Sequence, residues 1–430
     1  MRKIKQALIT LLWLGLLPCQ LFALTISEIY FEGNEVTQDR VLRQELLVHE
    51  GEEADAKLIE DSRQAMMNLG LFKSVTSRLE EGDNGSHLIF TLEERYFFLP
   101  IPLVGARAKN GNVADGLGSI NYGLELRLDN VMGLNQRLKL KYEKEDFEDA
   151  GSTASRETSI KYDIPRLIDT PYLLNMQVKQ VQLETEEVDL DVVIGSYRRE
   201  EMSGGFYLSR WLKTESIGHG WMAGGGLNVA TLEYSDRVGT ATSYSDAQTI
   251  ALSLGLSYTD IQEHPYHREG ETYGYSISVA STQLGSDNGF THHGLFYRSY
   301  RPVQFADSNI NTQVRLNVAN GVGTTYSVGN SALLRGYDND YATGNAMLLM
   351  NLEYHQHLSG YRQLRGVVFV DVGNAWASMA DMDLGNMPTG VGMGLRWRVQ
   401  SFVDVTLRMD YARSLDSGET KFILNSNASF

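Results

Sequence analysis

Cysteine, proline and long apolar runs are scarce in this sequence. Among 430 residues there are only 8 prolines and a single cysteine, Cys19. Beyond the N-terminal segment there is no apolar run of about 18 residues, which excludes transmembrane helices from the rest of the chain. Few prolines favour long strands, because proline lacks the N–H that a sheet ladder needs.

The first 23 residues have the pattern of a secretory signal peptide. A basic start precedes an apolar core at residues 7–17, and the small residue Ala23 precedes the expected cleavage site. A lipoprotein signal fits less well, because Pro18 stands before Cys19 where a small residue is expected. Cleavage after Ala23 removes the cysteine, so we expect neither disulfides nor thiol chemistry.

Acidic residues outnumber basic ones, with 54 Asp and Glu against 38 Lys and Arg, and the net charge is −16. Removal of the signal peptide takes away three cations and no acids, which makes the net charge −19. This balance argues against nucleic acid as a partner. We interpret it as acidic external loops and good solubility during transit.

Apolar and polar residues alternate along most of the chain after residue 98. Val368, Val370 and Val372 share one face of such a segment, and Asp371 lies on the other. A strand sends successive side chains to opposite faces, so each segment has one apolar face and one face of small or charged residues. The repetition of this pattern predicts a transmembrane β-barrel.

About 16 segments carry the pattern, an even number that is typical of bacterial outer-membrane barrels. They lie near 99–107, 118–129, 136–146, 155–165, 172–185, 192–211, 219–234, 248–261, 270–283, 290–302, 309–320, 345–357, 363–377, 389–400, 402–413 and 419–430. The segment 192–211 is interrupted by Gly204-Gly205, so it could form two strands instead of one. The predicted outward faces include Tyr122/Leu124/Leu126/Leu128, Leu138/Leu140/Tyr142 and Ile250/Leu252/Leu254/Leu256/Tyr258. The predicted inward faces include Glu125/Arg127/Asp129, Arg137/Lys139/Lys141 and Ala251/Ser253/Gly255/Ser257.

Residues 24–95 predict a separate α+β unit with the order β-α-α-β-β. Thr37 is a candidate N-cap of a first helix, and Asp55 is a candidate N-cap of a second. Gly70 follows the second helix as a C-terminal stop. The two closing strands are expected near 75–79 and 88–92, with a turn at Asp83-Asn84-Gly85.

Two motifs of this unit resemble the signatures of a POTRA domain, the periplasmic module of the BamA/TamA and two-partner-secretion superfamily. They are Ile29-x-Phe31-x-Gly33-Asn34 and Leu69-Gly70-Leu71-Phe72-x-x-Val75. After the signal peptide predicted at 1–23, the resemblance implies a POTRA domain at 24–95, with Gly33, Asn34, Gly70 and Phe72 as its signature residues, and an outer-membrane barrel at 98–430.

The resemblance extends through the barrel. Asp260 with Pro265 and Gly270, and the stretch Val370-Asp371-Val372-Gly373-Asn374-Ala375-Trp376, are similar to elements of the family's barrel. The chain ends in Phe430, as outer-membrane barrels commonly do. The last strand departs from the usual pattern, because its middle is small and polar. This predicts either a weak seal to the first strand or a lateral opening.

Leu334-Arg335-Gly336-Tyr337 resembles the V-R-G-[FY] motif of the family's sixth external loop, which tucks back into the barrel. Alternation independently places Glu353 and Asp371 on the inward faces of the next two strands. An inward carboxylate needs a cation, and arginine offers bidentate geometry. We therefore expect Arg335 to pair with Asp371 or Glu353 and to lock the loop; the alternative is an ordinary exposed arginine. Gly336 allows a close backbone approach or a positive φ.

Other chemistry finds little support in the sequence. His355 and His357 share a face, and His292 and His293 are adjacent, but neither pair has a convincing third metal ligand. There is no Gly-x-Ser-x-Gly elbow, phosphate loop or nucleotide fingerprint. We predict no catalytic residue, cofactor site or metal site, and hence a protein that is not an enzyme.

The resemblance implies an outer-membrane protein of a Gram-negative bacterium that takes part in inserting, assembling or translocating proteins. The expected partners are outer-membrane lipid, lipopolysaccharide, and unfolded clients or a periplasmic protein at the POTRA domain. Two alternatives remain: a two-partner-secretion-like exporter, although the sequence has neither a second POTRA domain nor a plug helix, and a passive channel, although porins lack the POTRA unit.

Overall fold

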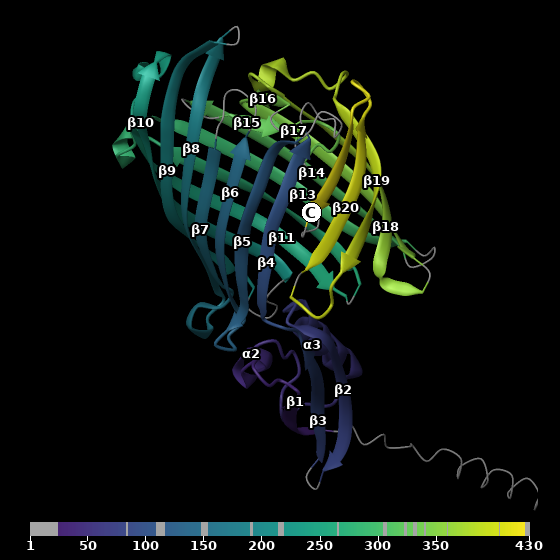
Figure 1. Cartoon of the computed structure of the whole chain (residues 1–430). Helices are drawn as coiled ribbons and strands as arrows, with labels where there is room; N and C mark the ends of the chain where they lie inside the picture. The colour runs from purple at the N-terminus through teal and green to yellow at the C-terminus, as the bar shows by residue number, and fades with distance from the viewer. Residues whose placement is uncertain are drawn as a thin grey trace, which may run out of the picture.

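The computed structural model describes residues 25–82, 85–108, 117–147, 154–189, 192–213, 219–264, 266–303, 308–321, 325–329, 333–338, 341–358, 360–403 and 405–425. A small N-terminal α+β domain lies at one end of a large barrel of strands (Figure 1). None of the helices in these described ranges is long and apolar enough to cross a bilayer. The predicted signal peptide and Phe430 lie outside the described residues.

The N-terminal domain is a three-stranded sheet with two helices. Its elements are β1 (Ile26–Glu32), α2 (Asp39–Arg43), α3 (Ala56–Asn68), β2 (Phe72–Gly82) and β3 (Gly85–Glu94). The strand order is β1-β3-β2, with β1 parallel and β2 antiparallel to the central β3. The β-α-α-β-β order predicted from the sequence is therefore present.

The two helix starts differ from one another. The Asp55 carboxylate accepts a hydrogen bond from the Lys57 backbone N–H at 2.7 Å, as expected of an N-cap. The predicted cap of the first helix is wrong, because α2 is preceded by Gln38, which makes no side-chain cap. The Thr37 backbone N–H and hydroxyl both bond to the Glu94 carboxylate instead. This tie joins the start of α2 to the end of β3.

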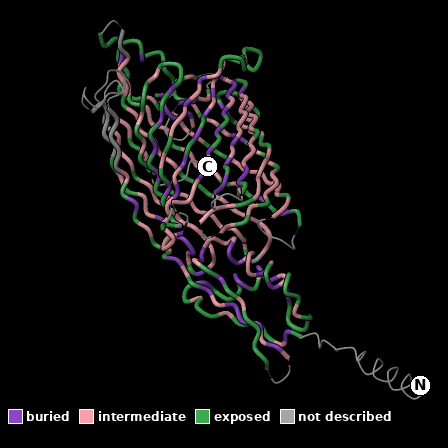
Figure 2. Tube along the Cα trace, turned by 90° about the vertical axis from the view of Figure 1, so that its right-hand side faces the viewer, coloured by how far each residue is buried: buried purple, intermediate pink, exposed green. Residues whose placement is uncertain are grey.

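The core of this domain draws on residues of all three strands and both helices, and buried stretches recur along its trace in Figure 2. Phe72, Phe90 and Met66 are completely buried in it. A residue from the barrel joins them, because Val403 packs into the same cluster. The N-terminal domain thus shares its apolar core with the turn between β19 and β20, which anchors it to the barrel.

The barrel is a 16-stranded sheet in which consecutive strands pair antiparallel. Its strands are β4 (Phe98–Ala108), β5 (Leu117–Val131), β6 (Gln136–Phe147), β7 (Ala154–Ile164), β8 (Tyr172–Asp189), β9 (Val192–Trp211), β10 (His219–Gly239), β11 (Ala247–Glu263), β12 (Arg268–Ala280), β13 (Phe290–Val303), β14 (Ser308–Gly321), β17 (Ala346–Leu358), β18 (Tyr361–Trp376), β19 (Thr389–Arg398), β20 (Thr406–Ser414) and β21 (Thr420–Asn425). Short 3-10 helices occur in the connections at η3 (Leu167–Asp169), η4 (Thr240–Ser243), η5 (Thr282–Leu284) and η6 (Met379–Asp381). The predicted strand number is confirmed.

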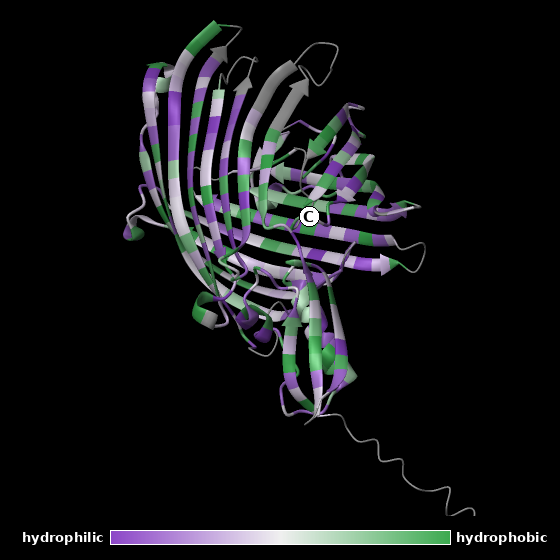
Figure 3. Ribbon diagram, turned by 60° about the horizontal axis from the view of Figure 1, so that its bottom comes forward, coloured by the Kyte–Doolittle hydropathy of each residue, from purple (hydrophilic) through white to green (hydrophobic). Residues whose placement is uncertain are grey.

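Hydrophobic and hydrophilic residues alternate along the strands, as Figure 3 shows. Val368 and Val370 are exposed on the outer surface, whereas Asp371 between Val370 and Val372 is fully buried. Leu252, Leu254 and other predicted lipid-facing residues are also exposed. The outward face is therefore the apolar one, which is the arrangement a bilayer requires.

The extent of β9 and the start of β20 depend on contacts with other parts of the fold. The segment 192–211 is one continuous strand, β9, because it pairs with β8 and β10 on both sides of Gly204-Gly205. The strand expected at 402–413 begins only at Thr406. Residues before it form a turn that docks on the N-terminal domain, where the Tyr96 N–H donates to the Ser401 carbonyl at 2.7 Å. Docking against another domain competes there with extension of the ladder.

Further turns at the same end of the barrel hold the N-terminal domain. Between β5 and β6, the Gly133 carbonyl accepts from the Gln38 N–H at 3.0 Å, and Asn130 donates to the Thr37 hydroxyl at 2.9 Å. Between β7 and β8, Arg166 pairs with the buried Glu45 carboxylate at 2.7 Å. These polar contacts orient the domain below the barrel mouth.

Candidate functional site

The connection between β14 and β17 enters the barrel instead of staying outside it. It contains a short hairpin of β15 (Tyr326–Val328) and β16 (Ala342–Gly344). Leu334 and Tyr337 from this connection pack with Met347 and Leu349 on the inward face of β17. Because Leu334 is fully buried, this apolar cluster fixes the connection against the inner wall.

Arg335 points into the wall from this connection and is fully buried. Its guanidinium makes two parallel hydrogen bonds to Asp371 on β18, Nε to Oδ2 at 2.5 Å and Nη2 to Oδ1 at 2.6 Å. Its Nη1 donates to Glu353 Oε1 on β17 at 2.5 Å. The ring of Phe369 lies under the guanidinium, with Cζ 3.4 Å from the ring centroid. The structure thus brings Arg335 together with both acids expected from the sequence.

A third carboxylate, Asp410 on β20, completes the surroundings of Arg335. Its Oδ2 lies 3.2 Å from Arg335 Nη1, and its Oδ1 lies 2.5 Å from Nη1 of Arg396 on β19. Arg396 also reaches Glu353 at 3.0 Å, and Arg408 contacts Asp410 at 2.5 Å. We call Arg335, Arg396, Arg408, Glu353, Asp371 and Asp410 the Arg335 cluster.

The Arg335 cluster is balanced, with three guanidiniums against three carboxylates. Taking charges out of water is costly unless each one finds opposite charge and hydrogen bonds. Polar neighbours occupy further positions: Asn351 donates to Asp371 at 2.8 Å, and His355 Nε2 lies 2.7 Å from Glu353 Oε2. Asn351 also donates to the Leu333 carbonyl at 2.7 Å, which ties the backbone of the connection to β17.

Two glycines allow the close approach of the connection to the wall. Gly336 has φ +95°, a left-handed conformation, and a Cβ there would lie 2.8 Å from the Ser414 nitrogen. A Cβ on Gly390 of β19 would lie 2.0 Å from the Arg335 carbonyl oxygen. Side chains at either position would therefore push the connection away from β19 and β20.

Tyr337 and Asp338 tie the same connection to the last strands. The Tyr337 hydroxyl donates to the Thr389 carbonyl at 3.0 Å and accepts from the Thr389 N–H at 2.9 Å. Asp338 forms an ion pair with Lys421 on β21. The connection therefore contacts β17 through β21, the strands that lead to the end of the barrel.

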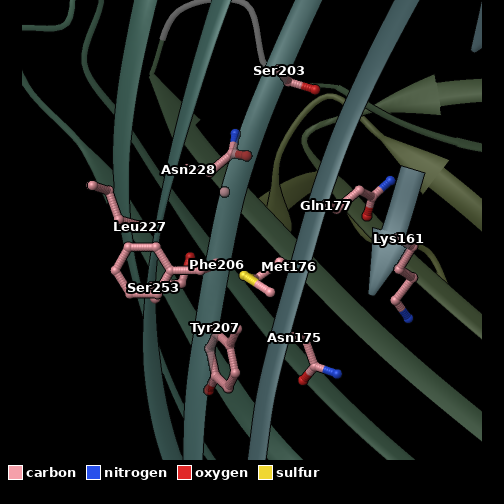
Figure 4. A pocket seen from close by; sticks show the side chains of 12 residues that line it. Lys161, Asn175, Met176, Gln177, Ser203, Phe206, Tyr207, Leu227, Asn228 and Ser253 are labelled. Carbon is pink, nitrogen blue, oxygen red and sulfur yellow. The ribbon is translucent and has the colours of Figure 1, made fainter. Parts of the chain in front are cut away.

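A cavity of about 280 Å³ lies among β7, β8, β9, β10 and β11 (Figure 4). Its labelled side chains include Lys161, Asn175, Gln177 and Asn228. The Tyr207 ring packs against a glycine of β10: a Cβ added to Gly224 would lie 2.7 Å from a ring carbon of Tyr207. The residues that line this cavity include one cation and no carboxylate, so they do not resemble an acid–base pair.

The N-terminal signature residues have structural roles. Gly33 has φ +86°, and a Cβ there would collide with the Leu92 carbonyl at 2.2 Å. Asn34 donates to the Thr37 carbonyl at 3.0 Å and to Asp39 at 2.8 Å, which shapes the entry to α2. Gly70 ends α3 with φ +74°, and Phe72 returns fully buried into the core.

Sequence reasoning missed Asp410, Arg396, Arg408, Asn351 and Gly390. Alternation did place the first three on the polar face of their strands. Nothing in the spacing distinguishes them from other inward charges, because the contacts that join them to Arg335 and Glu353 link residues 75 and 43 positions apart in the chain. Of the histidines, His355 contacts the Arg335 cluster through Glu353. His293 Nδ1 is hydrogen-bonded to the Tyr275 hydroxyl at 2.6 Å.

The fold and the buried arginine define a class: an outer-membrane β-barrel with a periplasmic domain and a connection anchored inside the lumen. Residues 130–421 match the Omp85 superfamily domain, and residues 24–95 match a POTRA domain described as a surface antigen variable number repeat. The first match covers more than half of the chain. The protein belongs to the Omp85 superfamily, and it is a Gram-negative outer-membrane protein with its POTRA domain in the periplasm.

One curated relative is the outer membrane protein assembly factor BamA of Buchnera aphidicola, 28% identical over 131 residues. That alignment spans 29% of this chain and 19% of the relative, so it covers only about a fifth of that protein's length. The structure also resembles solved structures. CdiB from Escherichia coli matches with a TM-score of 0.65 at 16% identity, over 94% of this chain and 74% of that one. BamA from Haemophilus ducreyi lacking POTRA domains 1–3 matches with a TM-score of 0.50 at 19% identity, over 93% and 83%. At these identities the likeness concerns the fold.

Proposed function

We propose that this protein takes part, without enzymatic chemistry, in inserting or translocating proteins at the outer membrane. Membership in the Omp85 superfamily supports this proposal. The observation that carries it is that each of the barrel's two end strands has only one ladder partner among the described residues. In the described part of the chain β4 pairs with β5 and β21 pairs with β20, and no described ladder joins β4 to β21.

Each end strand therefore has one edge without a described ladder partner. Backbone groups that lack a ladder partner are costly in lipid, so such an edge favours pairing with another strand. A client strand that adds to β4 would satisfy those groups and enter the bilayer in the same step. Phe98 and Phe422 are exposed on the outer surface of the two strands, where such a client would pass.

The POTRA domain offers an earlier binding edge. β2 lies at the edge of its sheet, paired with β3 alone among the described strands. An extended peptide binds such an edge by backbone hydrogen bonds, with little dependence on its sequence. We propose that unfolded clients or a periplasmic partner bind along β2. Outer-membrane lipid and lipopolysaccharide would surround the barrel's apolar face.

The Arg335 cluster has a supporting role in this proposal. It fixes the β14–β17 connection to β17, β18, β19 and β20, next to the seam between β4 and β21. A rigid wall on that side would confine movement to the end strands. The proposed lock therefore consists of Arg335, Gly336, Tyr337, Glu353 and Asp371, extended by Asp410.

Site-specific photocrosslinking in cells tests the proposal. A photoreactive residue at Phe98 on β4 or at Ser77 on β2 is expected to capture unfolded outer-membrane proteins. The matched control for Phe98 is Tyr275 on β12, which is also exposed to lipid but lies on a paired strand. The control for Ser77 is Lys57 in the first turn of α3, which is also exposed and makes no hydrogen bond to β2 among the described residues.

Depletion and conductance separate insertion from the alternatives. Depletion that lowers the abundance of other barrels supports an insertase, whereas loss of one secreted polypeptide supports an exporter. Equal capture at Phe98 and Tyr275, together with a large steady conductance in planar bilayers, would refute the proposal and favour a passive channel.

A further inference from the structure

The periplasmic turn between β11 and β12 places two histidines and a glutamate on one face. Glu263 and Arg268 form the last pair of the ladder, and the His264 N–H continues it by donating to the His267 carbonyl at 2.9 Å. Directly opposite residues of an antiparallel ladder share a face. Glu269 lies two residues beyond His267 and therefore shares that face too.

The three side chains converge. The imidazole rings of His264 and His267 stack, with centroids 4.7 Å apart and planes 18° apart. One nitrogen of each ring and a carboxylate oxygen of Glu269 lie within 4.8 Å of one another. His264 Nε2 faces Glu269 Oε2 at 3.7 Å and is a buried nitrogen without a hydrogen-bond partner among the described residues.

We propose that His264, His267 and Glu269 bind one divalent transition-metal ion, with Zn²⁺ the best fit. Two imidazoles and one carboxylate are a ligand set that Zn²⁺ prefers, and water can complete the tetrahedron. Bonds of about 2.0–2.2 Å require the three atoms to draw closer together, which side-chain rotation in a partly exposed turn allows. The metal would also give the buried His264 nitrogen a partner.

The site lies on the outer face of the barrel, at its periplasmic end. Tyr258 of β11 is paired with Tyr273 of β12, and Trp221 packs against both rings. Aromatic rows of this kind mark the membrane interface. The three ligands lie beyond this row toward the periplasm, so the ion would be reached from water.

The same turn is held by the POTRA domain, which gives the ion a structural consequence. Gln64 of α3 donates to the Glu263 carbonyl at 2.9 Å, and Asn68 accepts from the Glu263 N–H at 2.9 Å. Arg398 of β19 donates to the His264 carbonyl at 3.1 Å. An ion that cross-links His264 to His267 and Glu269 would order the turn that α3 contacts, and so stiffen the junction between domain and barrel. This inference does not depend on the proposed function.

Zn²⁺ titration of the metal-free, detergent-solubilised full chain, with any affinity tag removed, tests the site. Isothermal titration calorimetry is expected to show one Zn²⁺ per chain. His264→Ala and His267→Ala are expected to weaken binding at least about tenfold. Glu269→Gln is a further variant at an exposed position. His49→Ala, which removes an exposed histidine of the POTRA domain, is the matched control and should bind like the parent.

Hydrogen exchange tests the consequence. Zn²⁺ should slow exchange in residues 261–270 and 64–69 of the parent protein and of His49→Ala, and not in His264→Ala. Failure of the parent to bind Zn²⁺, or equal binding by His264→Ala and His49→Ala, would overturn the site. Binding that leaves exchange at both segments unchanged would overturn the role at the junction.

Discussion

Arg335 and Asp371 form a fully buried, bidentate ion pair between a connection that enters the lumen and the inner wall of β18. The two residues are 36 positions apart in the sequence. Such a pair differs from a surface salt bridge, because removal of one partner leaves an uncompensated charge away from water.

Arg335→Ala should destabilise the barrel by about 3–5 kcal/mol, because Asp371 and Glu353 would stay buried without their cation. Arg335→Lys should recover only part of this loss, since an ammonium cannot reproduce two parallel hydrogen bonds. The temperature at which the folded band disappears in heat-modifiability gels measures the effect. Arg199→Ala, which removes a half-exposed arginine paired with Glu201, should change it little. Equal stability of the Ala variants would contradict the lock.

Asp410→Asn should weaken the barrel although sequence reasoning gave this residue no role. The substitution leaves three guanidiniums facing two carboxylates in the Arg335 cluster. Adding Arg408→Gln removes one of the excess cations and should restore part of the stability. A double-mutant cycle measured by urea unfolding gives the coupling energy, expected to be about 0.5–3 kcal/mol. Strict additivity of the two substitutions would show that Asp410 and Arg408 act independently.

Gly390→Ala should displace the β14–β17 connection from the wall. The new Cβ would lie 2.0 Å from the Arg335 carbonyl oxygen. Because this is a backbone atom, the clash can be relieved only if the connection itself shifts. Protease digestion of the folded protein should then cleave between residues 322 and 345. Gly366→Ala on the neighbouring strand is the control, because its Cβ would meet nothing closer than 3.5 Å. Identical digestion patterns for the two variants would contradict this account of close packing.

Glu45 should make attachment of the POTRA domain depend on pH. Burial raises the pKa of its carboxyl above the ordinary value of 4.5, and Arg166 only partly offsets that effect. A carboxyl whose pKa is raised by folding contributes stability below its ordinary pKa, and this contribution is lost as the pH rises through the folded value. The free energy of unfolding of the domain should therefore fall as the pH rises above 4.5, by at most about 1.4 kcal/mol per unit.

Glu45→Gln should remove this dependence, since an amide does not titrate. Pulse proteolysis in urea, performed on the intact protein between pH 4 and pH 8, compares the two proteins. Asp61→Asn, at a partly exposed carboxyl of α3, is a control that should keep the slope of the parent. Parallel pH profiles for the parent and Glu45→Gln would show that another group is responsible.

The sequence by itself determined the architecture. Period-two alternation is a local property of the chain, and the bilayer requires the apolar face to point outward, so Val368 and Asp371 could be assigned to faces without coordinates. The ends of α3 were also determined by local residues: Asp55 caps its start, and Gly70 follows its end. The same parity placed Glu353 and Asp371 on the inner wall, and with the Arg335 motif this was sufficient to predict the ion pair.

Only the tertiary structure decided which of the many inward charges meet. Glu353 meets Arg396, and Asp410 meets Arg335, because the paired strands β17 to β20 surround one connection that enters the barrel. No sequence spacing encodes these contacts. Val403 was expected in a strand, yet it is buried in the POTRA core, where removal from water outweighs extension of a ladder at its end. The converging His264, His267 and Glu269 likewise depend on a hairpin register, because one residue of slip would turn the two histidines to opposite faces.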